Sequence, residues 1–276
     1  MAKLFPKLVS SLALLLLLCQ FGYVACQPPV NSPSRNATLP ADEEKALEDL
    51  LIKLEWGFHP NISRSACSSN FEYIKCDCTD ENSTVCHVTG LDLGFNELTG
   101  QLPPQLGELK YLNHLDVGSN NLSGELPGNY ANFSTWDQLR VAGNRLTGQV
   151  PKFIANWNGL SYLVIRNCSI SGEIPPYIGD WSRLKYLSLA YNMLSGQIPK
   201  ELGDLSNLKM IDLSFNNLSG GIPDSMKNLN LTKMFLTGNM LSGTVPPWLP
   251  RKIKDTADLS YNNFDDGQKG EGKLNM

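Results

Sequence analysis

Residues 184–199, with the sequence L-K-Y-L-S-L-A-Y-N-M-L-S-G-Q-I-P, decide the fold of this 276-residue chain. Spaced leucines lead to an asparagine, and a segment of the form L-S-G-x-I-P closes the unit. The asparagine position returns in five intervals of 24 residues and then two of 23, with cysteine in its place once. The residues at this position are Asn96, Asn120, Asn144, Cys168, Asn192, Asn216, Asn239 and Asn262. A unit repeated at this period indicates a solenoid in which similar coils stack on one another.

Each unit is expected to begin with a short strand whose leucines face inward, while the residues between them face solvent on the other side. One unit cannot bury its own leucines, so neighbouring coils must stack at about 4.8 Å per step to form a parallel sheet and a continuous core. The asparagine turns inward where the strand ends, and its amide can satisfy buried backbone groups of adjacent coils. The closing segment appears seven times, as GQLP, GELP, GQVP, GEIP, GQIP, GGIP and GTVP, and its proline restricts φ on the convex side. We therefore predict seven full repeats and a truncated eighth over residues 88–264.

These motifs carry a family resemblance. The frame L-x-x-L-x-L-x-x-N, with N-L-S-G-E-L-P at 121–127 and N-L-S-G-G-I-P at 217–223, resembles the plant extracellular type of leucine-rich repeat. The CDC at 76–78, the CHV at 86–88 and the RNCSISGEIP at 166–175 are similar to the ectodomain of plant leucine-rich-repeat receptor-like serine/threonine kinases that also carry a malectin-like domain. The resemblance implies an α/β solenoid, a leucine-rich-repeat horseshoe with a parallel concave β-sheet and a helical, disulfide-tied N-terminal cap.

The same resemblance implies a recognition function outside the cell. Full-length proteins of that family carry a membrane helix and a cytoplasmic kinase, but this chain contains no H-R-D, no D-F-G and no glycine-rich loop followed by a lysine strand. We expect a truncated or secreted receptor-like protein that is not an enzyme and that binds a peptide, a protein ectodomain or a cell-wall glycan on its concave face. One alternative is a soluble inhibitor of a cell-wall-degrading hydrolase, similar to the plant leucine-rich inhibitors of polygalacturonase, which usually carry cysteine pairs at both ends. A purely structural wall glycoprotein is a third interpretation.

The two ends of the chain are expected to lie outside the repeats. Residues 1–26 are interpreted as a signal peptide, because an uncharged apolar core of 12 residues follows two lysines and is short for a membrane span. An uncleaved signal anchor is the rival interpretation. Residues 27–40 are expected to form a flexible leader, residues 41–87 an N-terminal cap that begins with a helix, and residues 265–276 a polar tail. No cysteine pair follows the last repeat, so the core is expected to be poorly covered there.

Localisation follows from these segments. No second apolar run of membrane length follows the signal peptide, so no membrane span is expected once that peptide is cleaved. We predict a product secreted to the apoplast, or one at the plasma-membrane surface if the chain is a fragment of a receptor kinase.

The cysteines fit the oxidising conditions of secretion. The four cap cysteines are Cys67, Cys76, Cys78 and Cys86. Of the three pairings that four cysteines allow, the one that joins Cys76 to Cys78 is sterically the worst. We favour Cys67 with Cys76 and Cys78 with Cys86, over a zinc knot of four thiolates. Cys168 fills an asparagine position and is expected to be a small buried ladder residue, with a reactive or intermolecular thiol as the alternative.

Glycosylation signals are frequent along the chain. Eight N-x-S/T sequons fit a glycosylated surface and agree with passage through the secretory pathway. They lie at Asn36, Asn61, Asn82, Asn121, Asn132, Asn167, Asn217 and Asn230.

Charge and polar motifs exclude several other functions. A formal charge of −4 gives no electrostatic reason for binding nucleic acid or anionic lipid. The three histidines, His59, His87 and His114, form neither an H-E-x-x-H motif nor an evident catalytic triad. We therefore expect no catalytic residue, no metal site, no cofactor and no nucleic-acid partner.

The candidate binding residues are large exposed positions of repeats four to seven. Alternation along the strands gathers aromatic and apolar side chains there on the concave face. A contiguous exposed patch of this kind is a binding-site candidate, and tyrosine and arginine are typical anchors. The candidates are Tyr162, Arg166, Tyr186, Tyr191, Met210, Phe215 and Phe235.

A structural interpretation competes with this binding patch. Tyr191 and Phe215 can pack sideways against neighbouring coils, and Arg140 can pair with Asp116. A glycan on Asn167 would obstruct the patch.

Overall fold

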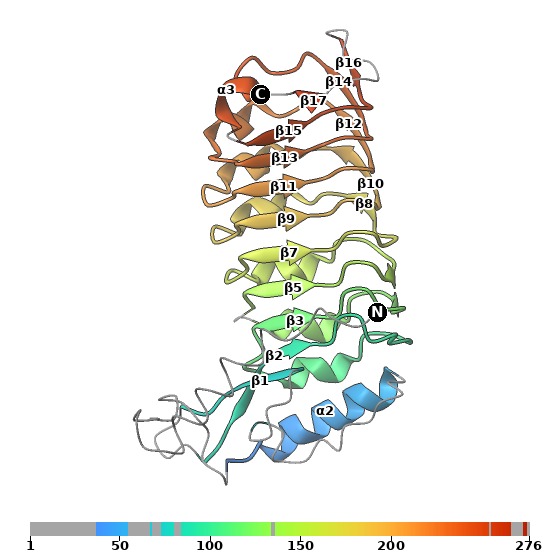
Figure 1. The fold of residues 1–276 in the computed structure, drawn as a ribbon, viewed down its shortest axis with the longest axis vertical. Coiled ribbons are helices and arrows are strands. Elements are labelled where there is room, and N and C mark those ends of the chain that lie inside the picture. Colours follow the sequence, from blue (N-terminus) through green and yellow to red (C-terminus); the bar gives the residue numbers. More distant parts are fainter. Residues whose placement is uncertain are drawn as a thin grey trace, which may run out of the picture.

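The computed structural model describes residues 37–54, 67, 73–79, 84–133, 136–253, 255–265 and 273–274. The predicted signal peptide, residues 1–26, lies outside the described residues. The repeats form one elongated stack, with α2 (Ala41–Lys53) at one end and β15 (Thr256–Asp258) near the other (Figure 1). The predicted solenoid is confirmed.

One sheet runs the length of the stack and takes one strand from each repeat; we call it the concave sheet. Its order is β1-β2-β3-β5-β7-β9-β11-β13-β15-β17, and the strands pair in parallel except for the outermost pair at each edge. In the three-residue strands the middle residue is buried, so Leu139, Leu163 and Leu187 pair in register within the core. The strand bounds are β1 Ile74–Asp77, β2 His87–Asp92, β3 His114–Asp116, β5 Gln138–Arg140, β7 Tyr162–Val164, β9 Tyr186–Ser188, β11 Met210–Asp212, β13 Lys233–Phe235, β15 Thr256–Asp258 and β17 Lys273–Leu274.

A second sheet runs along one side of the stack, in the order β16-β14-β12-β10-β8; we call it the lateral sheet. It is formed by the L-S-G segments, and β4 and β6 pair in the same way in earlier repeats. The bounds are β4 Ser123–Gly124, β6 Arg145–Leu146, β8 Ser171–Glu173, β10 Met193–Gln197, β12 Asn217–Gly220, β14 Met240–Gly243 and β16 Asn263–Phe264.

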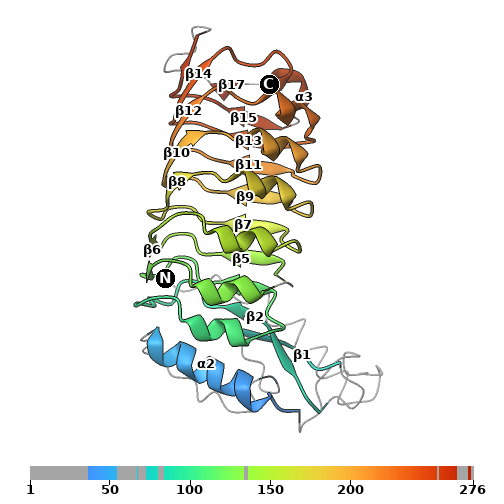
Figure 2. The same cartoon turned by 180° about the vertical axis from the view of Figure 1, so that it is seen from behind.

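Short 3-10 helices lie behind the concave sheet (Figure 2). Each begins directly after the proline that closes its repeat, and these prolines have φ between −76° and −61°. Proline is suited to this place because its ring holds φ near the required value. The helices are η2 Pro104–Glu108, η3 Gly128–Asn132, η4 Lys152–Asn156, η5 Pro176–Asp180, η6 Lys200–Asp204 and η7 Asp224–Asn228, and the short α3, Leu249–Lys252, follows in the next repeat.

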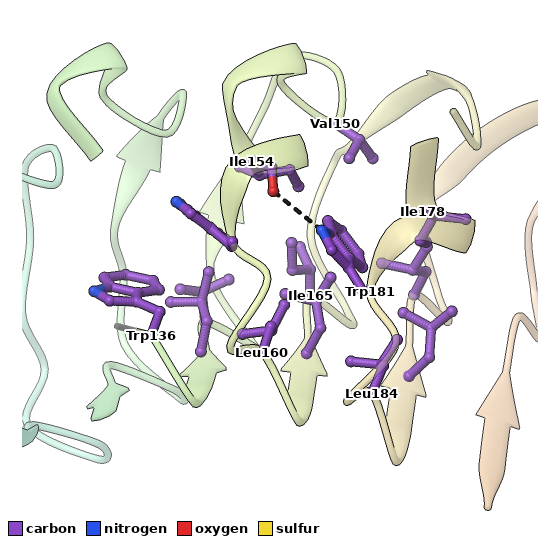
Figure 3. Packing of buried hydrophobic residues seen from close by; sticks show 14 of the residues in the cluster. Trp136, Val150, Ile154, Leu160, Ile165, Ile178, Trp181 and Leu184 are labelled. Carbon is purple, nitrogen blue, oxygen red and sulfur yellow. Dashed lines mark hydrogen bonds between the residues drawn. The ribbon is translucent and has the colours of Figure 1, made fainter. Parts of the chain in front are cut away.

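The core between these layers is aliphatic, with a stack of tryptophans in its middle coils. Trp136, Trp157 and Trp181 are fully buried, and the rings of Trp136 and Trp157 lie 4.7 Å apart. The Trp181 Nε1–H donates to the Ile154 carbonyl at 3.2 Å, which links two consecutive coils (Figure 3). Trp157 makes the equivalent bond to the Tyr130 carbonyl at 3.0 Å. These bonds satisfy the Nε1–H groups of Trp157 and Trp181, whereas that of the buried Trp136 has no partner among the described residues.

The asparagine position of each repeat, which we call its rung, ties the coils together as expected. The Asn216 Nδ2 donates to the carbonyls of Leu189, in the preceding coil, and Leu213, in its own coil, at 2.9 and 3.1 Å. Its Oδ1 accepts the Leu194 N–H at 3.0 Å. The same three-way pattern recurs at Asn120, Asn144, Asn239 and Asn262.

Cys168 departs from this pattern. Its thiol is free and half-buried rather than fully buried, which corrects the sequence expectation. The Sγ lies 3.6 Å from the Val141 carbonyl oxygen and 3.7 Å from that of Arg166. A thiol is a weak donor and a weak acceptor, so this rung holds its neighbouring coils less firmly than an amide does.

The N-terminal cap closes one end of the core. Leu47, Leu50 and Leu54 of the α2 region are buried, as their helical spacing predicts, while the side chain of Leu51 lies outside the described residues. Buried Glu43 accepts the Val88 N–H at 2.7 Å and lies 2.7 Å from the His87 Nδ1, so the helix is tied directly to β2.

The cysteines of the cap pair as the sequence favours. Cys67 is bonded to Cys76 and Cys78 to Cys86, so the zinc knot is wrong. The last residues of the predicted flexible leader also belong to the cap, because Ala37 is buried in the core.

The other end of the core is less open than expected. Strand β17, within the predicted polar tail, pairs antiparallel with β15 and so covers the edge of the concave sheet. The core there includes Phe264, which is 2% exposed. Over the described residues, no helix is long and apolar enough to span a membrane.

Candidate functional site

The first part of the candidate site is a row of side chains along the concave sheet, which we call the strand row. Tyr162, Tyr186 and Met210 occupy equivalent positions in β7, β9 and β11 and pair in register. The two tyrosine rings stack with their centroids 6.0 Å apart and an interplanar angle of 23°. Arg140 extends the row on one side, with its Cζ 6.0 Å from the Tyr162 ring centroid. All four side chains are half-buried, so they form a continuous floor.

The second part lies where the strands end, at the residue that precedes each rung; we call this position the corner. Tyr191 and Phe215 are the corners of repeats five and six, and their rings stack 4.4 Å apart at 22°. Arg166 lies over the Tyr191 ring at 5.9 Å, a cation–π arrangement. The two rings are 45% and 42% exposed, so this stack, which we call the corner row, is accessible to a partner.

The backbone makes these corner aromatics costly to keep. The coil geometry imposes a positive φ at the corner of all eight repeats, including 55° at Tyr191 and 53° at Phe215. Glycine adopts such angles without strain, whereas an ordinary side chain costs roughly 1–2 kcal/mol. Gly238 fills the next corner, and a Cβ there would lie 2.7 Å from the Cδ1 of Phe215. The same strain is present at Phe95 and Tyr261, so it is a property of the coil and is not confined to these two rings.

A third column of residues lies between the two rows. It contains Ser188, which is 1% exposed and whose Oγ has no hydrogen-bond partner, and Phe235, which is half-buried in β13. The Arg140 Nε is likewise buried without a partner. Buried polar atoms are normally paired, so these two are exceptions, as is the Trp136 Nε1 among the described residues. Asp212 of the same column accepts the Ser214 N–H at 3.1 Å.

The site's electrostatics keep the Tyr186 phenol neutral. Burial and the nearby Asp212 raise the pKa of Tyr186, while the positive charges of Arg166 and Arg140 oppose that rise. The phenol is therefore protonated at physiological pH and able to donate a hydrogen bond.

A hollow of about 400 Å³ adjoins the corner row on its N-terminal side. It is lined by Ser119, Ala142, Gly143, Arg166, Asn167 and Tyr191. A separate open groove of about 750 Å³ lies on the convex side near η4 and includes Phe153 and Tyr177. The Tyr177 hydroxyl already donates to the Pro151 carbonyl at 2.8 Å, and burial raises its pKa to about 12, so its polar atom is engaged in holding the convex turn.

All seven sequence-predicted candidates lie in this region, in three sets. Tyr162, Tyr186 and Met210 form the strand row, and Phe235 lies in the middle column. The corner row holds Arg166, Tyr191 and Phe215. The two rings of the corner row pack against each other, as the structural interpretation predicts. They are also exposed, so this packing leaves them accessible to a partner.

Sequence reasoning missed two features of the site. The structural interpretation pairs Arg140 with Asp116, but Arg140 lies over Tyr162, and the Asp116 Oδ1 accepts the Gly118 N–H at 2.8 Å. The unpartnered Ser188 was also missed. An arginine one repeat before a surface tyrosine could have indicated the first, whereas no sequence signal reveals the second. No set of three or more metal-ligating side chains gathers anywhere in the described ranges.

Comparisons with known proteins agree with this architecture. A family model described as "Leucine rich repeat" matches residues 158–218, and a second leucine-rich-repeat model matches residues 87–109, 111–133 and 230–251. A probable LRR receptor-like serine/threonine-protein kinase of Arabidopsis thaliana is 36% identical over 114 residues, which cover 34% of this chain and 10% of that protein. The chain thus spans about a tenth of the length of this curated relative.

Solved structures show the same relationship. PEPR1 in complex with AtPEP1 has a TM-score of 0.69 at 26% identity, over 82% of this chain and 36% of that one. The Arabidopsis receptor kinase HAESA ectodomain, solved with an N-terminally extended IDA peptide hormone, has a TM-score of 0.60 at 34% identity, over 66% of this chain and 30% of that one. A plant ice-binding protein has a TM-score of 0.73 at 26% identity, over 82% of this chain and 73% of that one. The chain therefore carries leucine-rich repeats and resembles plant receptor ectodomains in its fold.

Proposed function

We propose that this chain recognises an extracellular peptide, or the ectodomain of a partner protein, on the concave face of repeats four to seven. The observation that carries the proposal is the pair of stacked rows, the strand row and the corner row, which run side by side across consecutive coils. Aromatic and arginine side chains dominate binding energy at protein interfaces, and here they are held in place by the stack itself. The similarity to receptors solved with peptide hormones supports the same assignment.

The dimensions of the surface suit a short extended segment. From β7 to β13 the ligand would cross three coil steps, about 14 Å at about 4.8 Å per step, which is the length of about four extended residues. The half-buried Tyr162, Tyr186 and Met210 would contact its apolar side chains. Arg140 and Arg166 stand beside the two rows, so an uncharged or acidic ligand is favoured over a basic one.

The proposed setting is the outside of a plant cell. The chain would act as the recognition part of a receptor-like protein, either free in the apoplast or displayed at the plasma membrane. The disulfides of the cap support an oxidising compartment. Kinase activity belongs to the relatives' other domains and is not proposed for these repeats.

The proposal can be tested by ligand capture with matched variants. The secreted protein is screened against displayed peptides, a panel of plant ectodomains and pectic oligosaccharides, and then each hit is titrated against Tyr186→Ala/Met210→Ala. Loss of two central anchors should weaken binding at least about 100-fold. The control is Lys200→Ala/Glu201→Ala on the convex helix η6, which should leave affinity unchanged.

Three outcomes would contradict the proposal. Equal binding by the concave and convex variants would place the ligand elsewhere. Capture of oligosaccharides alone would show that the surface recognises glycan. Inhibition of a fungal polygalacturonase that survives in the concave variant would favour the inhibitor interpretation.

The lateral sheet supports a second candidate function, binding to an ice surface. Ser171, Ser195, Ser219 and Ser242 place one hydroxyl in each coil, at the coil spacing of about 4.8 Å. Two of these hydroxyls make the same bond, since Ser171 and Ser219 each donate to the glycine carbonyl of the preceding coil at 3.3 Å. A periodic hydroxyl array suits a periodic ligand, and a structural neighbour is a plant ice-binding protein.

Ice recrystallisation assays separate this candidate from the first. The wild-type chain should slow recrystallisation, and Ser195→Tyr, which breaks the array, should abolish the effect. Tyr186→Ala/Met210→Ala should retain it. Unchanged ice growth with the wild-type chain would remove the candidate.

A further inference from the structure

Asn167 is an unusual corner residue. It is exposed, its φ is 54°, and within the described part of the chain its side chain makes no hydrogen bond. It also opens the sequon Asn167-Cys168-Ser169, whose cysteine is a free thiol. Asparagine tolerates a positive φ better than most residues, so the corner conformation presents this amide to solvent with little strain.

The surroundings of Asn167 form a seat for a ring. It lines the hollow of about 400 Å³, a size within the range of small-ligand sites. On one side of it the corners are the small residues Ser119 and Gly143, which leave the hollow open. On the other side the exposed Tyr191 ring lies one coil away, held between Arg166 and Phe215.

The other described sequons lack this setting. Asn121 and Asn217 are exposed at the start of lateral segments, and Asn132 and Asn230 are exposed near the ends of convex turns. None of these four lines either of the hollows described above. They therefore provide controls in the same molecule.

We propose that Asn167 carries an N-linked glycan whose first N-acetylglucosamine lies in the hollow against the Tyr191 ring. In the secretory pathway the Asn167 Nδ2 would attack the anomeric carbon of a lipid-linked oligosaccharide diphosphate. A C–N bond forms, the C–O bond to the diphosphate breaks, and one amide proton is lost as the lipid diphosphate departs. No oxidation or reduction takes place.

The chemistry of the hollow matches this sugar. Arg166 and Phe215 lie over the Tyr191 ring, so the C–H face of the pyranose would cover the part of the ring edge that remains exposed, which removes apolar surface from water. The Arg166 guanidinium carries donors for the sugar hydroxyls or the acetamido oxygen. The small corners on the other side provide the room that a bulky side chain would take.

A regulatory consequence rests on the proposed function. A glycan seated here occupies the edge of the corner row, so it would leave the strand row as the part of the concave surface open to a ligand. The glycosylated and the bare chain would then differ in which ligands they accept.

The first experiment measures occupancy. The full chain is secreted from a plant or insect cell line, and glycopeptides that contain Asn167 and Asn217 are quantified by mass spectrometry. We expect Asn167 to be occupied in most molecules. An unmodified Asn167 beside an occupied Asn217 would overturn the proposal.

The second experiment tests the contact with Tyr191. Glycans are trimmed to a single N-acetylglucosamine, and melting temperatures are compared with those of Ser169→Ala, which removes the sequon but keeps the asparagine at its positive φ. Loss of the sugar should lower the melting temperature by about 2–4 °C in the wild-type background, and by much less in a Tyr191→Ala background. Asn217→Gln is the control and should shift both backgrounds equally. Equal shifts for Ser169→Ala would overturn the seat on Tyr191.

These readouts are independent of ligand binding. If no ligand binds either glycoform, the proposed function fails, while occupancy and melting temperature still decide the glycan's place. If a ligand binds, an affinity that is the same with and without the Asn167 glycan would remove the regulatory consequence alone.

Discussion

Repeat six and repeat four solve the same structural problem with different rungs. Asn216 uses both ends of its amide, since its Nδ2 donates to the Leu189 and Leu213 carbonyls and its Oδ1 accepts a backbone N–H. In repeat four the Cys168 sulfur makes long contacts, of 3.6 and 3.7 Å, where the asparagine amide donates to carbonyl oxygens. The comparison teaches that the stack tolerates one weak rung when both neighbouring rungs are asparagine. That weak rung lies next to Asn167 and the hollow.

The largest expected effect comes from removing a strong rung. Asn216→Ala would leave the Leu194 N–H without its acceptor and would remove one of the two amide donors from each of the Leu189 and Leu213 carbonyls, which keep their bonds from Asn192 and Asn239. This variant should lower the free energy of unfolding by about 3 kcal/mol. Cys168→Ala, the matched change in repeat four, should cost less than about 1 kcal/mol because no strong bond is lost. Urea titration followed by tryptophan fluorescence measures both. Equal losses would contradict the distinction between the rungs.

A smaller effect of opposite sign is expected when the cysteine of the weak rung is replaced by asparagine. In repeat three the Asn144 Oδ1 accepts the Leu122 N–H at 2.9 Å, and Cys168→Asn would offer the same acceptor to Leu146. We expect this variant to gain about 1 kcal/mol in the free energy of unfolding. Cys168→Ser, which cannot span both coils, is the control and should gain less. A loss on introducing asparagine would show that repeat four has adapted its backbone to sulfur.

The smallest expected effect is a loss of wild-type stability at alkaline pH. Burial raises the pKa of the Cys168 thiol above its ordinary value of 9.0, although the backbone N–H groups of Asn144, Leu146 and Gly143 oppose this. The folded chain therefore keeps the thiol proton to a higher pH than the unfolded chain, so this contribution to stability is full below the ordinary pKa and decreases as pH rises above it. The stability advantage of Cys168→Asn over wild type should widen between about pH 7 and about pH 10. Melting temperatures of the pair at both values measure it, and a constant difference would contradict the assignment.

Much of the fold could be predicted because the same residue types recur at the same positions of each repeat and impose the same local geometry. The asparagine period implies an amide that bridges coils, and Asn120, Asn144 and Asn216 do so. The prolines mark where the convex turns begin. The seven candidate residues could be placed on one surface because alternation along a strand and equal spacing between repeats determine which side chains become neighbours.

The rest depends on contacts that no local pattern encodes. The two residues of β17 carry no periodicity, so their pairing with β15 was not foreseeable. The convex 3-10 helices are too short for an amphipathic period to show. Whether Arg140 faces Asp116 or Tyr162 depends on the direction of its side chain. A cation–π contact and an exposed ion pair stabilise a protein by similar free energies, so the sequence does not decide between them.

The antiparallel strands at both margins of the concave sheet have a consequence for association. A parallel sheet with free margins offers unpaired backbone groups on which another molecule can continue the pattern. Here β1 occupies the margin beside β2, and β17 occupies the margin beside β15, each running against the direction of the repeats. A second copy that continued the parallel pattern of the repeats would have to displace one of them. The direction of these two outer strands therefore acts as a stop against filament growth.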